Sequence, residues 1–294
     1  MKQIAIIAPT ASGKTALSIK LAHKIDAVIL SLDSLSIYKQ IDIASAKPTI
    51  KERDGIIHFG IDEIYPNEKF DVMKFIELYH QAKQYATQHN KNLIIVGGTS
   101  FYLKSLIDGI SILPTITQGI QKIIDTKLQT FSNQELYEYL YRIDPTYMEN
   151  IKPNDSYRIE KALSIYLQTK QKPSEYFIQN PPKPIIEDIQ IYEIVWEVEA
   201  LRQRIALRTK QMIAQGLIDE VIFLEQNYTR DFPPMKAIGI KETLDYLDSK
   251  ITKKELEEKI TIATAQLAKR QRTFNKGQFQ NVIRGSLEEL GKII

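Results

Sequence analysis

QIAIIAPTASGKT, from Gln3 to Thr15, is the stretch that decides the fold of this chain. Its first five residues are an apolar run typical of a buried strand, and the pattern from Lys14 to His23 is typical of a helix. Between them, Ala8–Thr15 has the spacing of a Walker A phosphate loop, with alanine in place of the usual first glycine. The order strand, phosphate loop, helix predicts that the chain begins as an α/β fold.

The loop predicts a site for the phosphates of a small molecule. Its backbone N–H groups and the N-terminus of the following helix attract anionic oxygens, Lys14 supplies a positive charge, and the Thr15 hydroxyl can reach Mg²⁺, the predicted cofactor. The loop alone does not say which phosphate compound it holds, and a small-molecule kinase is one alternative. The predicted phosphate-binding residues are Ala8, Pro9, Thr10, Ala11, Ser12, Gly13, Lys14 and Thr15.

Two further apolar runs, Ala27–Ser31 and Leu93–Val96, resemble the first. Each is followed by a turn or loop and then by a helical pattern, of which Asp71–Gln88 shows a clear apolar stripe. Alternation of strands and helices is typical of a parallel sheet. We therefore predict an α/β fold, a P-loop NTPase-like parallel sheet flanked by helices.

The chain changes character at residues 115–185, where helical segments, tyrosine and glutamine are frequent and no buried strand is evident. A proline cluster from Pro173 to Pro184 closes this region, and Ile189–Trp196 then resembles a strand that returns to the sheet. We predict a discontinuous core, residues 1–114 and 186–294, that carries a helical insertion, residues 115–185. Three helical patterns follow the returning strand: Glu199–Leu224, Lys241–Leu247 and Lys253–Lys276.

The composition excludes several classes of protein. None of the 294 residues is cysteine, which rules out disulfides, thiolate nucleophiles and cysteine-bound metal centres and fits a reducing compartment. No apolar stretch approaches the roughly 20 residues that a membrane helix needs. We predict a cytoplasmic protein without a membrane partner, and nothing in the sequence suggests more than a monomer.

Positive charge is concentrated near the C-terminus, although the net charge is only +3. No acidic residue lies between Lys259 and Leu287. A basic face of this kind is typical of polyanion binding, and a solvated helix face is the alternative. The cations of this stretch are Lys259, Lys269, Arg270, Arg272, Lys276 and Arg284.

Asp33 follows the second apolar run, at the point where a strand would end. The carboxyl ends of neighbouring parallel strands share one crevice, so Asp33 should lie beside the phosphate loop. There it could be a general base or a metal ligand, or it could cap a turn or helix that starts at Asp33-Ser34. The third run ends in Gly97-Gly98-Thr99 rather than in a Walker B aspartate, which argues against the usual ATPases and GTPases.

Several blocks of the sequence resemble, in order, the motifs of the tRNA dimethylallyltransferase family. They span nearly the whole chain. Besides the phosphate loop they are Ser31–Tyr38, Asp42–Pro48, Gly97–Tyr102, Pro153–Asp155 with Arg158-Ile159, Arg208–Met212 with Gly216-Leu217, Ala237–Lys241, and Gln266–Gln271.

This resemblance implies transfer of a dimethylallyl group from dimethylallyl diphosphate to the exocyclic N6 amine of the adenosine adjacent to the anticodon of tRNA, with release of diphosphate. In that family the phosphate loop holds the prenyl diphosphate, and the target base is flipped out of the anticodon loop, because a stacked base cannot be attacked. The implied partners are the anticodon stem-loop of tRNA and dimethylallyl diphosphate. Prenylation of free adenylate is a related alternative.

The resemblance also assigns the catalytic residues. Asp33 matches the family's general base, Thr10 lies in the loop where substrate contacts are expected, and Arg208 is similar to an arginine that clamps the leaving diphosphate.

Arg208 has support from its own position in the sequence. Leu201, Ile205, Arg208 and Met212 fall on one stripe of a helix, so the arginine lies on the inward, apolar side. A charge on that side needs a partner, either a phosphate oxygen or a structural salt bridge.

The resemblance points to tRNA contacts over much of the chain, and the insertion would pack over the anticodon arm. Ser36 stands where glutamine is common in the family, and Lys236 and Lys241 stand where arginine is frequent, which keeps the charge but loses the bidentate geometry. The predicted tRNA-contacting residues are Asp33, Ser34, Leu35, Ser36, Thr99, Gln121, Tyr157, Arg158, Lys161, Lys236 and Lys241, and the basic stretch Lys269–Lys276 is expected to meet phosphates as well.

Overall fold

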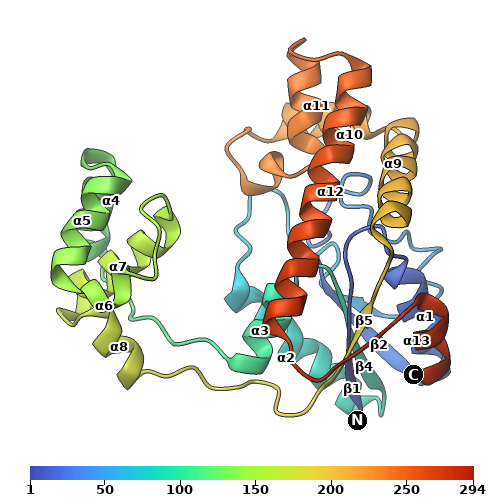
Figure 1. The fold of residues 1–294 in the computed structure, drawn as a ribbon, viewed down its shortest axis with the longest axis horizontal. Helices are drawn as coiled ribbons and strands as arrows, with labels where there is room; N and C mark the ends of the chain where they lie inside the picture. The colour runs from blue at the N-terminus through green and yellow to red at the C-terminus, as the bar shows by residue number, and fades with distance from the viewer. The chain divides into compact units, whose positions relative to one another are not determined.

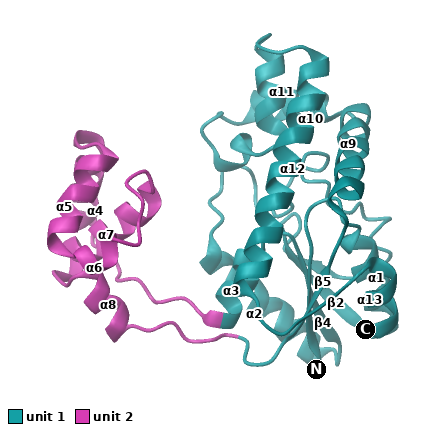
Figure 2. Cartoon of the chain, in the orientation of Figure 1, with its two compact units in different colours: residues 1–107, 186–294 teal, residues 108–185 magenta.

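The structure is a computed structural model that describes residues 1–294. The chain forms two compact units: unit 1 consists of Met1–Ile107 and Ile186–Ile294, and unit 2 is Asp108–Ile185 (Figure 2). The chain leaves unit 1 and re-enters it at neighbouring points, because the Ile186 N–H donates to the Leu106 carbonyl at 3.0 Å. No helix has both the length and the apolar composition needed to cross a membrane.

Unit 1 is built on a parallel sheet with the strand order β3-β2-β4-β1-β5-β6. The central strand β1 pairs with β4 on one side and with β5 on the other. Because every pair is parallel, the carboxyl ends of all strands lie along one edge, where the phosphate loop begins. The strands are β1 Gln3–Ile7, β2 Ala27–Leu32, β3 His58–Phe59, β4 Asn92–Gly97, β5 Gln190–Ile194 and β6 Val282–Gly285.

Helices cover both faces of this sheet, with α1 and α13 on one side and α2 and α3 on the other (Figure 1). The predicted parallel sheet with flanking helices is therefore confirmed. The helices of this part of the chain are α1 Lys14–Lys24, α2 Val72–Gln88, α3 Ser100–Asp108, α9 Val198–Ala214, α10 Leu217–Asn227, the 3₁₀ helix η1 Pro233–Lys236, α11 Ile240–Leu247, α12 Lys253–Gln278 and α13 Leu287–Ile293.

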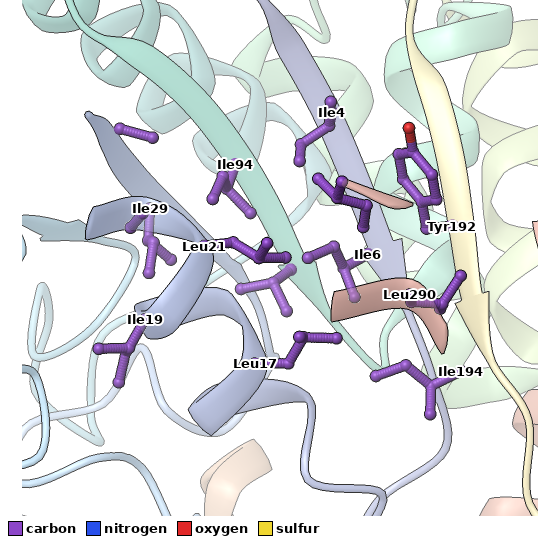
Figure 3. Close-up of a cluster of buried hydrophobic side chains, with 14 of the residues drawn as sticks. Ile4, Ile6, Leu17, Ile19, Leu21, Ile29, Ile94, Tyr192, Ile194 and Leu290 are labelled. Atoms are coloured by element: carbon purple, nitrogen blue, oxygen red, sulfur yellow. The ribbon is translucent and has the colours of Figure 1, made fainter. Parts of the chain in front are cut away.

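The core on the α1 side follows from alternation along the strands. Ile4 and Ile6 of β1 point to the face that α1 covers with Leu17 and Leu21, and Leu290 of α13 completes the cluster (Figure 3). Each such side chain contributes about 1.5–3 kcal/mol when it is fully buried. This packing fixes the start of α1, and with it the phosphate loop, against the sheet.

Unit 2 consists of helices without a strand. Its core contains Ile124, Leu140, Met148 and Leu163. Asp144 is buried and accepts hydrogen bonds from the N–H of Tyr147 at 3.1 Å and from the N–H and hydroxyl of Ser174 at 2.7 and 3.0 Å. The helices are α4 Gln118–Thr130, α5 Asn133–Ile143, α6 Pro145–Met148, α7 Ser156–Thr169 and α8 Pro173–Gln179.

The structure differs from the sequence predictions in two respects. The pattern predicted as one helix, Glu199–Leu224, is two helices, α9 and α10, because Gly216 adopts a left-handed backbone (φ 104°) between them. The short edge strands β3 and β6 were not predicted, and neither was α13. Two to four residues are too few for the period-two pattern that identifies a strand.

Gly97 at the end of β4 has no room for a side chain. A Cβ there would lie 2.5 Å from both Cβ and the carbonyl oxygen of Leu32, on the neighbouring strand. We expect Gly97→Ala to lower the free energy of unfolding by about 1–3 kcal/mol, because the sheet backbone must shift. Urea unfolding followed by circular dichroism measures this change.

Gly277, in the last turn of α12, is the matched control, since a Cβ there meets nothing within 4 Å. Gly277→Ala should leave the protein unchanged or stabilise it by up to about 1 kcal/mol. Equal unfolding midpoints for the two variants would contradict the steric argument.

Candidate active site

The phosphate loop joins the carboxyl end of β1 to the N-terminus of α1. Ala11 (φ 61°) and Gly13 (φ 86°) have a left-handed backbone, which glycine adopts freely and alanine adopts at some cost. No side chain caps α1, and its first turn holds no acidic residue. Its free N–H groups and the positive end of its dipole are therefore available to an anion.

Arg204 and Trp196 hold the middle of the loop in place. Arg204 of α9 donates from Nε to the Ala11 carbonyl at 2.8 Å, and Trp196 donates from Nε1 to the Ser12 carbonyl at 3.0 Å. The Arg204 guanidinium also lies over the Trp196 ring, 4.6 Å from its centroid. Arg204 was not predicted, although its position one helical turn before Arg208 could have identified it.

A cavity of about 1440 Å³ opens over this loop, within unit 1. Its walls include Thr10–Thr15, Asp33, Ser36, Arg204 and Arg208, so the structure brings the three predicted catalytic side chains to one space. Of the predicted phosphate-binding residues, Ala8 and Pro9 do not line this cavity.

Lys14 is a partly buried cation that lines the cavity. Burial lowers its pKa from the usual 10.5 to about 8; the Asp33 carboxylate opposes this change and the Arg208 guanidinium adds to it. The ammonium group is therefore poorly compensated within the protein. A bound anion would favour its charged form.

Asp33 lies immediately beyond β2 and uses one of its two oxygens in a turn. Its Oδ1 accepts hydrogen bonds from the N–H of Leu35 at 2.8 Å and from the N–H of Ser36 at 3.1 Å. No protein group donates to Oδ2. The turn role that the sequence left open is thus present, and it leaves the second oxygen available to take a proton.

Arg208 lies on the inward side of α9 with Leu201 and Ile205, which are buried. It forms no ion pair. Its Nη1 lies 3.4 Å from Thr10 Oγ1, and its Nη2 lies 3.4 Å from the Ala46 carbonyl oxygen. Burial lowers the pKa of Arg208. The nearby Asp33 carboxylate raises this pKa, and the Arg204 guanidinium lowers it further. The structural salt bridge considered for this residue is absent, so its charge is left for a ligand.

The segment from Asp42 to Lys47 is held by Glu220 and by an ion pair between its own two ends. The Glu220 carboxylate of α10 accepts hydrogen bonds from the N–H groups of Asp42, Ile43 and Ala44 at 2.7–2.9 Å. The Lys47 ammonium is buried and lies 2.6 Å from the Asp42 carboxylate. Together they fix the Ala46 carbonyl that Arg208 contacts. Glu220 was not predicted, because nothing in its local sequence indicates a contact with a segment 178 residues away.

The other residues predicted to contact tRNA within unit 1 follow β2 and β4 or lie on η1 and α11. Thr99 donates its N–H to the Leu32 carbonyl at 2.9 Å, beside Asp33, but it does not line the cavity. Ser34 is exposed. Lys236, at the end of η1, and Lys241, in the first turn of α11, are exposed and form no ion pair.

The predicted contacts of unit 2 lie on α4 and α7. Tyr157 is 65% exposed, and the Lys161 ammonium lies over its ring, 5.4 Å from the centroid. Arg158 pairs with Asp155 at 3.3 Å. Gln121 of α4 donates to Asp125 at 2.8 Å. A solvent-facing aromatic ring beside cations is an arrangement that can stack on a base.

The basic stretch of α12 is a set of exposed cations without ion pairs: Lys269, Arg270, Arg272 and Lys276. Arg284 differs, because its Nε donates to the buried Glu193 at 2.8 Å. The unpaired charges of α12 are free to meet the phosphates of a polyanion.

Comparison with known proteins shows what the chain is similar to. A family model described as IPP transferase matches residues 36–278. A protein of Aliarcobacter butzleri named tRNA dimethylallyltransferase is 55% identical over 294 residues, covering 100% of this chain and 98% of that protein. A protein of the same name from a Sulfurovum species is 56% identical and covers 100% of this chain and 97% of that protein.

Solved structures agree over the length of the chain. A tRNA isopentenylpyrophosphate transferase from Bacillus halodurans superposes with a TM-score of 0.72 at 29% identity, covering 99% of this chain and 95% of that one. A eukaryotic dimethylallyltransferase, described as acting on tRNA, superposes with a TM-score of 0.84 at 27% identity, covering 97% of this chain and 74% of that one.

The low pKa of Lys14 predicts how an anion should bind. Below about pH 8 the ammonium is charged and attracts diphosphate; above it the charge is lost. We expect the affinity for inorganic diphosphate, relative to a Lys14→Arg variant whose charge does not titrate, to fall by up to about tenfold per pH unit above this point. Calorimetric titration from about pH 7 to about pH 9.5 measures it. If the ratio of the diphosphate affinities of the unmodified protein and of Lys14→Arg did not change with pH, Lys14 would not bind the anion.

Proposed function

Because the chain belongs to the IPP transferase family, we propose that it transfers a dimethylallyl group from dimethylallyl diphosphate to the exocyclic N6 amine of the adenosine adjacent to the anticodon in tRNA. The family resemblance read from the motifs is confirmed by the family model and by relatives that are similar over their full length. The chain is accordingly an enzyme of prenyl transfer to tRNA. Neither a small-molecule kinase nor an adenylate prenyltransferase is among the relatives described above.

The observation that carries the proposal is one cavity with an uncapped phosphate loop, two poorly compensated cations and a carboxylate with a free oxygen. In the proposed reaction the N6 nitrogen forms a bond to C1 of the dimethylallyl group as the C1–O bond breaks. The electron pair of that bond leaves with diphosphate. The proton lost from N6 passes to Oδ2 of Asp33.

Lys14, Arg208 and the N–H groups at the start of α1 would bind the diphosphate. Negative charge grows on the leaving diphosphate as the C1–O bond breaks, and fixed positive groups in a cavity stabilise that charge without reorganising. The buried Ser12 hydroxyl, which has no hydrogen-bond partner in the protein, lies in the same loop. Thr10 would position Arg208 through its hydroxyl.

Mg²⁺ is the proposed cofactor, and Thr15 is its proposed protein ligand. The Thr15 hydroxyl lines the cavity and makes no hydrogen bond within the protein. The structure holds no cluster of three or more acidic, histidine or cysteine side chains that could bind a metal. One hydroxyl with phosphate oxygens and water is a donor set that suits Mg²⁺, which would neutralise part of the diphosphate charge.

The tRNA side of the reaction involves surfaces of both units. We propose that Asp33–Ser36, Thr99, Lys236 and Lys241 contact the anticodon loop from unit 1. Exposed cations on α12 add sequence-independent attraction for phosphates. For the helical insertion, Gln121, Tyr157, Arg158 and Lys161 are the proposed contacts. The domain boundaries, the monomeric state and the cytoplasmic location remain predictions from the sequence.

The proposed function is tested with radiolabelled dimethylallyl diphosphate and tRNA lacking the modification. We expect the label to appear in the anticodon loop, located by nuclease digestion, and diphosphate to be released in equal amount. Label on free AMP but not on tRNA would establish the adenylate alternative. Release of ADP from ATP without transfer of label would establish a kinase.

Asp33→Asn tests the proposed base without removing the turn, because the amide oxygen can still accept from the N–H groups of Leu35 and Ser36. We expect kcat to fall by a factor of about 10²–10⁴, the usual cost of losing a general base. Single-turnover transfer of label measures the rate, and diphosphate affinity is measured alongside because Asp33 also supports the charge of Lys14.

Asp71→Asn is the matched control. Asp71 caps α2 with the same geometry, accepting from the N–H groups of Met73 and Lys74, but lies outside the cavity. The Asp71→Asn variant should transfer label at a rate within about twofold of that of the unmodified protein. If Asp33→Asn also kept that rate, Asp33 would be a turn residue only.

A further inference from the structure

Gln271 of α12 joins the phosphate loop to the end of the neighbouring strand. Its Oε1 accepts a hydrogen bond from the Thr10 N–H at 2.9 Å, and its Nε2 donates to the Gly98 carbonyl at 3.0 Å. Thr10 follows β1 and Gly98 follows β4, the strand that pairs with β1. One side chain thus touches both chain segments at the edge where the cavity opens.

The bond pattern explains why an amide side chain is needed here. The backbone ladder between β1 and β4 ends where the Ala8 N–H donates to the Gly97 carbonyl at 3.4 Å. Beyond this point β1 turns into the phosphate loop and β4 turns toward α3. A primary amide presents one acceptor and donors in the arrangement of a peptide group, so Gln271 satisfies backbone groups that the separating strands no longer satisfy for each other.

The contact reaches the cavity through Thr10. Its N–H is bound to Gln271, and its hydroxyl lies 3.4 Å from Nη1 of Arg208. A change at Gln271 would therefore move the backbone of Thr10 and with it the group that contacts the arginine. The three residues come from α12, the phosphate loop and α9, which lie far apart in the sequence.

We propose that Gln271 is a positioning residue, which fixes Thr10 and through it the Arg208 guanidinium against the diphosphate. The proposal rests on the proposed function for the identity of the diphosphate as leaving group. Both polar atoms of its amide are bonded to backbone groups of the protein, which is the arrangement of a positioning residue.

Gly98 supplies an independent way to break this contact. A Cβ at Gly98 would lie 2.4 Å from Nε2 of Gln271, and the next neighbouring residue, Ala8, would be 3.4 Å away at its carbonyl oxygen. Gly98→Ala would thus displace the Gln271 amide and little else. In a protein that already carries Gln271→Ala, the clash with the amide is gone, and the nearest atom to the added methyl group is the Ala8 carbonyl oxygen, at 3.4 Å.

Asn275, one helical turn after Gln271, separates positioning of the loop from anchoring of the helix. It is fully buried, and its Nδ2 donates to Oε1 of Glu193 on β5 at 3.0 Å. It therefore ties α12 to the sheet without touching the phosphate loop. If Gln271 served only to hold α12, loss of Asn275 would have the same kinetic effect.

The experiment measures kcat for prenyl transfer, the affinity for inorganic diphosphate and the affinity for tRNA. Gln271→Met fills the same space without the two hydrogen bonds. We expect it to lower kcat and to weaken diphosphate binding by about tenfold each, since small displacements of positioning groups can cost up to about 10²-fold. The affinity for tRNA should stay within about twofold of the unmodified protein.

The remaining variants sharpen the test. Gly98→Ala should reproduce the loss, and Gly98→Ala with Gln271→Ala should be no worse than Gln271→Ala alone, because both changes act on one contact. Asn275→Ala should lower the unfolding midpoint but keep kcat within about twofold. If Gly98→Ala or Gln271→Ala does not fold, the decision rests on the comparison of Gln271→Met with the unmodified protein.

The outcomes separate this inference from the proposed function. Unchanged kcat and diphosphate affinity in Gln271→Met, or an equal loss of both in Asn275→Ala, would overturn the positioning role. If the unmodified protein transferred no label to tRNA, the proposed function would fail, and the diphosphate affinities would still decide whether Gln271 sets the loop.

Discussion

Parallel pairing of β1, β2 and β4 is the constraint on which the rest of the site depends. Parallel strands must end on the same edge of a sheet, so the loop after β1, Asp33 after β2 and Thr99 after β4 are brought together although they are separated in the sequence. The packing of Leu17 and Leu21 on this sheet then sets the start of α1. The anion site is therefore a consequence of strand topology before any side chain chemistry is added.

Helix α9 contributes two of the positive charges of the site. Arg204 and Arg208 of α9 line the same cavity as Lys14, and the Asp33 carboxylate is the group that opposes the lowered pKa of both Lys14 and Arg208. Burial lowers the pKa of both Lys14 and Arg208, and the neighbouring arginine lowers each further, so these charges are unfavourable without a ligand. An anion with several oxygens stabilises them. The free protein is thus preorganised for its ligand at the expense of some stability.

Much of this arrangement could be predicted from the sequence, and the reasons for success and failure are physical. The phosphate loop and Asp33 follow apolar runs, so local pattern and strand topology were enough to place them. Arg208 was marked by an apolar stripe. Glu220 and Gln271 act through contacts with segments 173 to 261 residues distant, and no local pattern contains such contacts. The break at Gly216 was missed because apolar periodicity continues across it.

The hydrogen bond from Ile186 to Leu106 joins the two points of unit 1 between which unit 2 is inserted. Residues Asp108 to Ile185 are inserted between two neighbouring points of unit 1, and they contribute no strand to the sheet. Unit 2 also has its own apolar core. During evolution such a segment can be replaced, lengthened or shortened as a unit. What it binds can therefore change while the residues at the edge of the sheet stay the same.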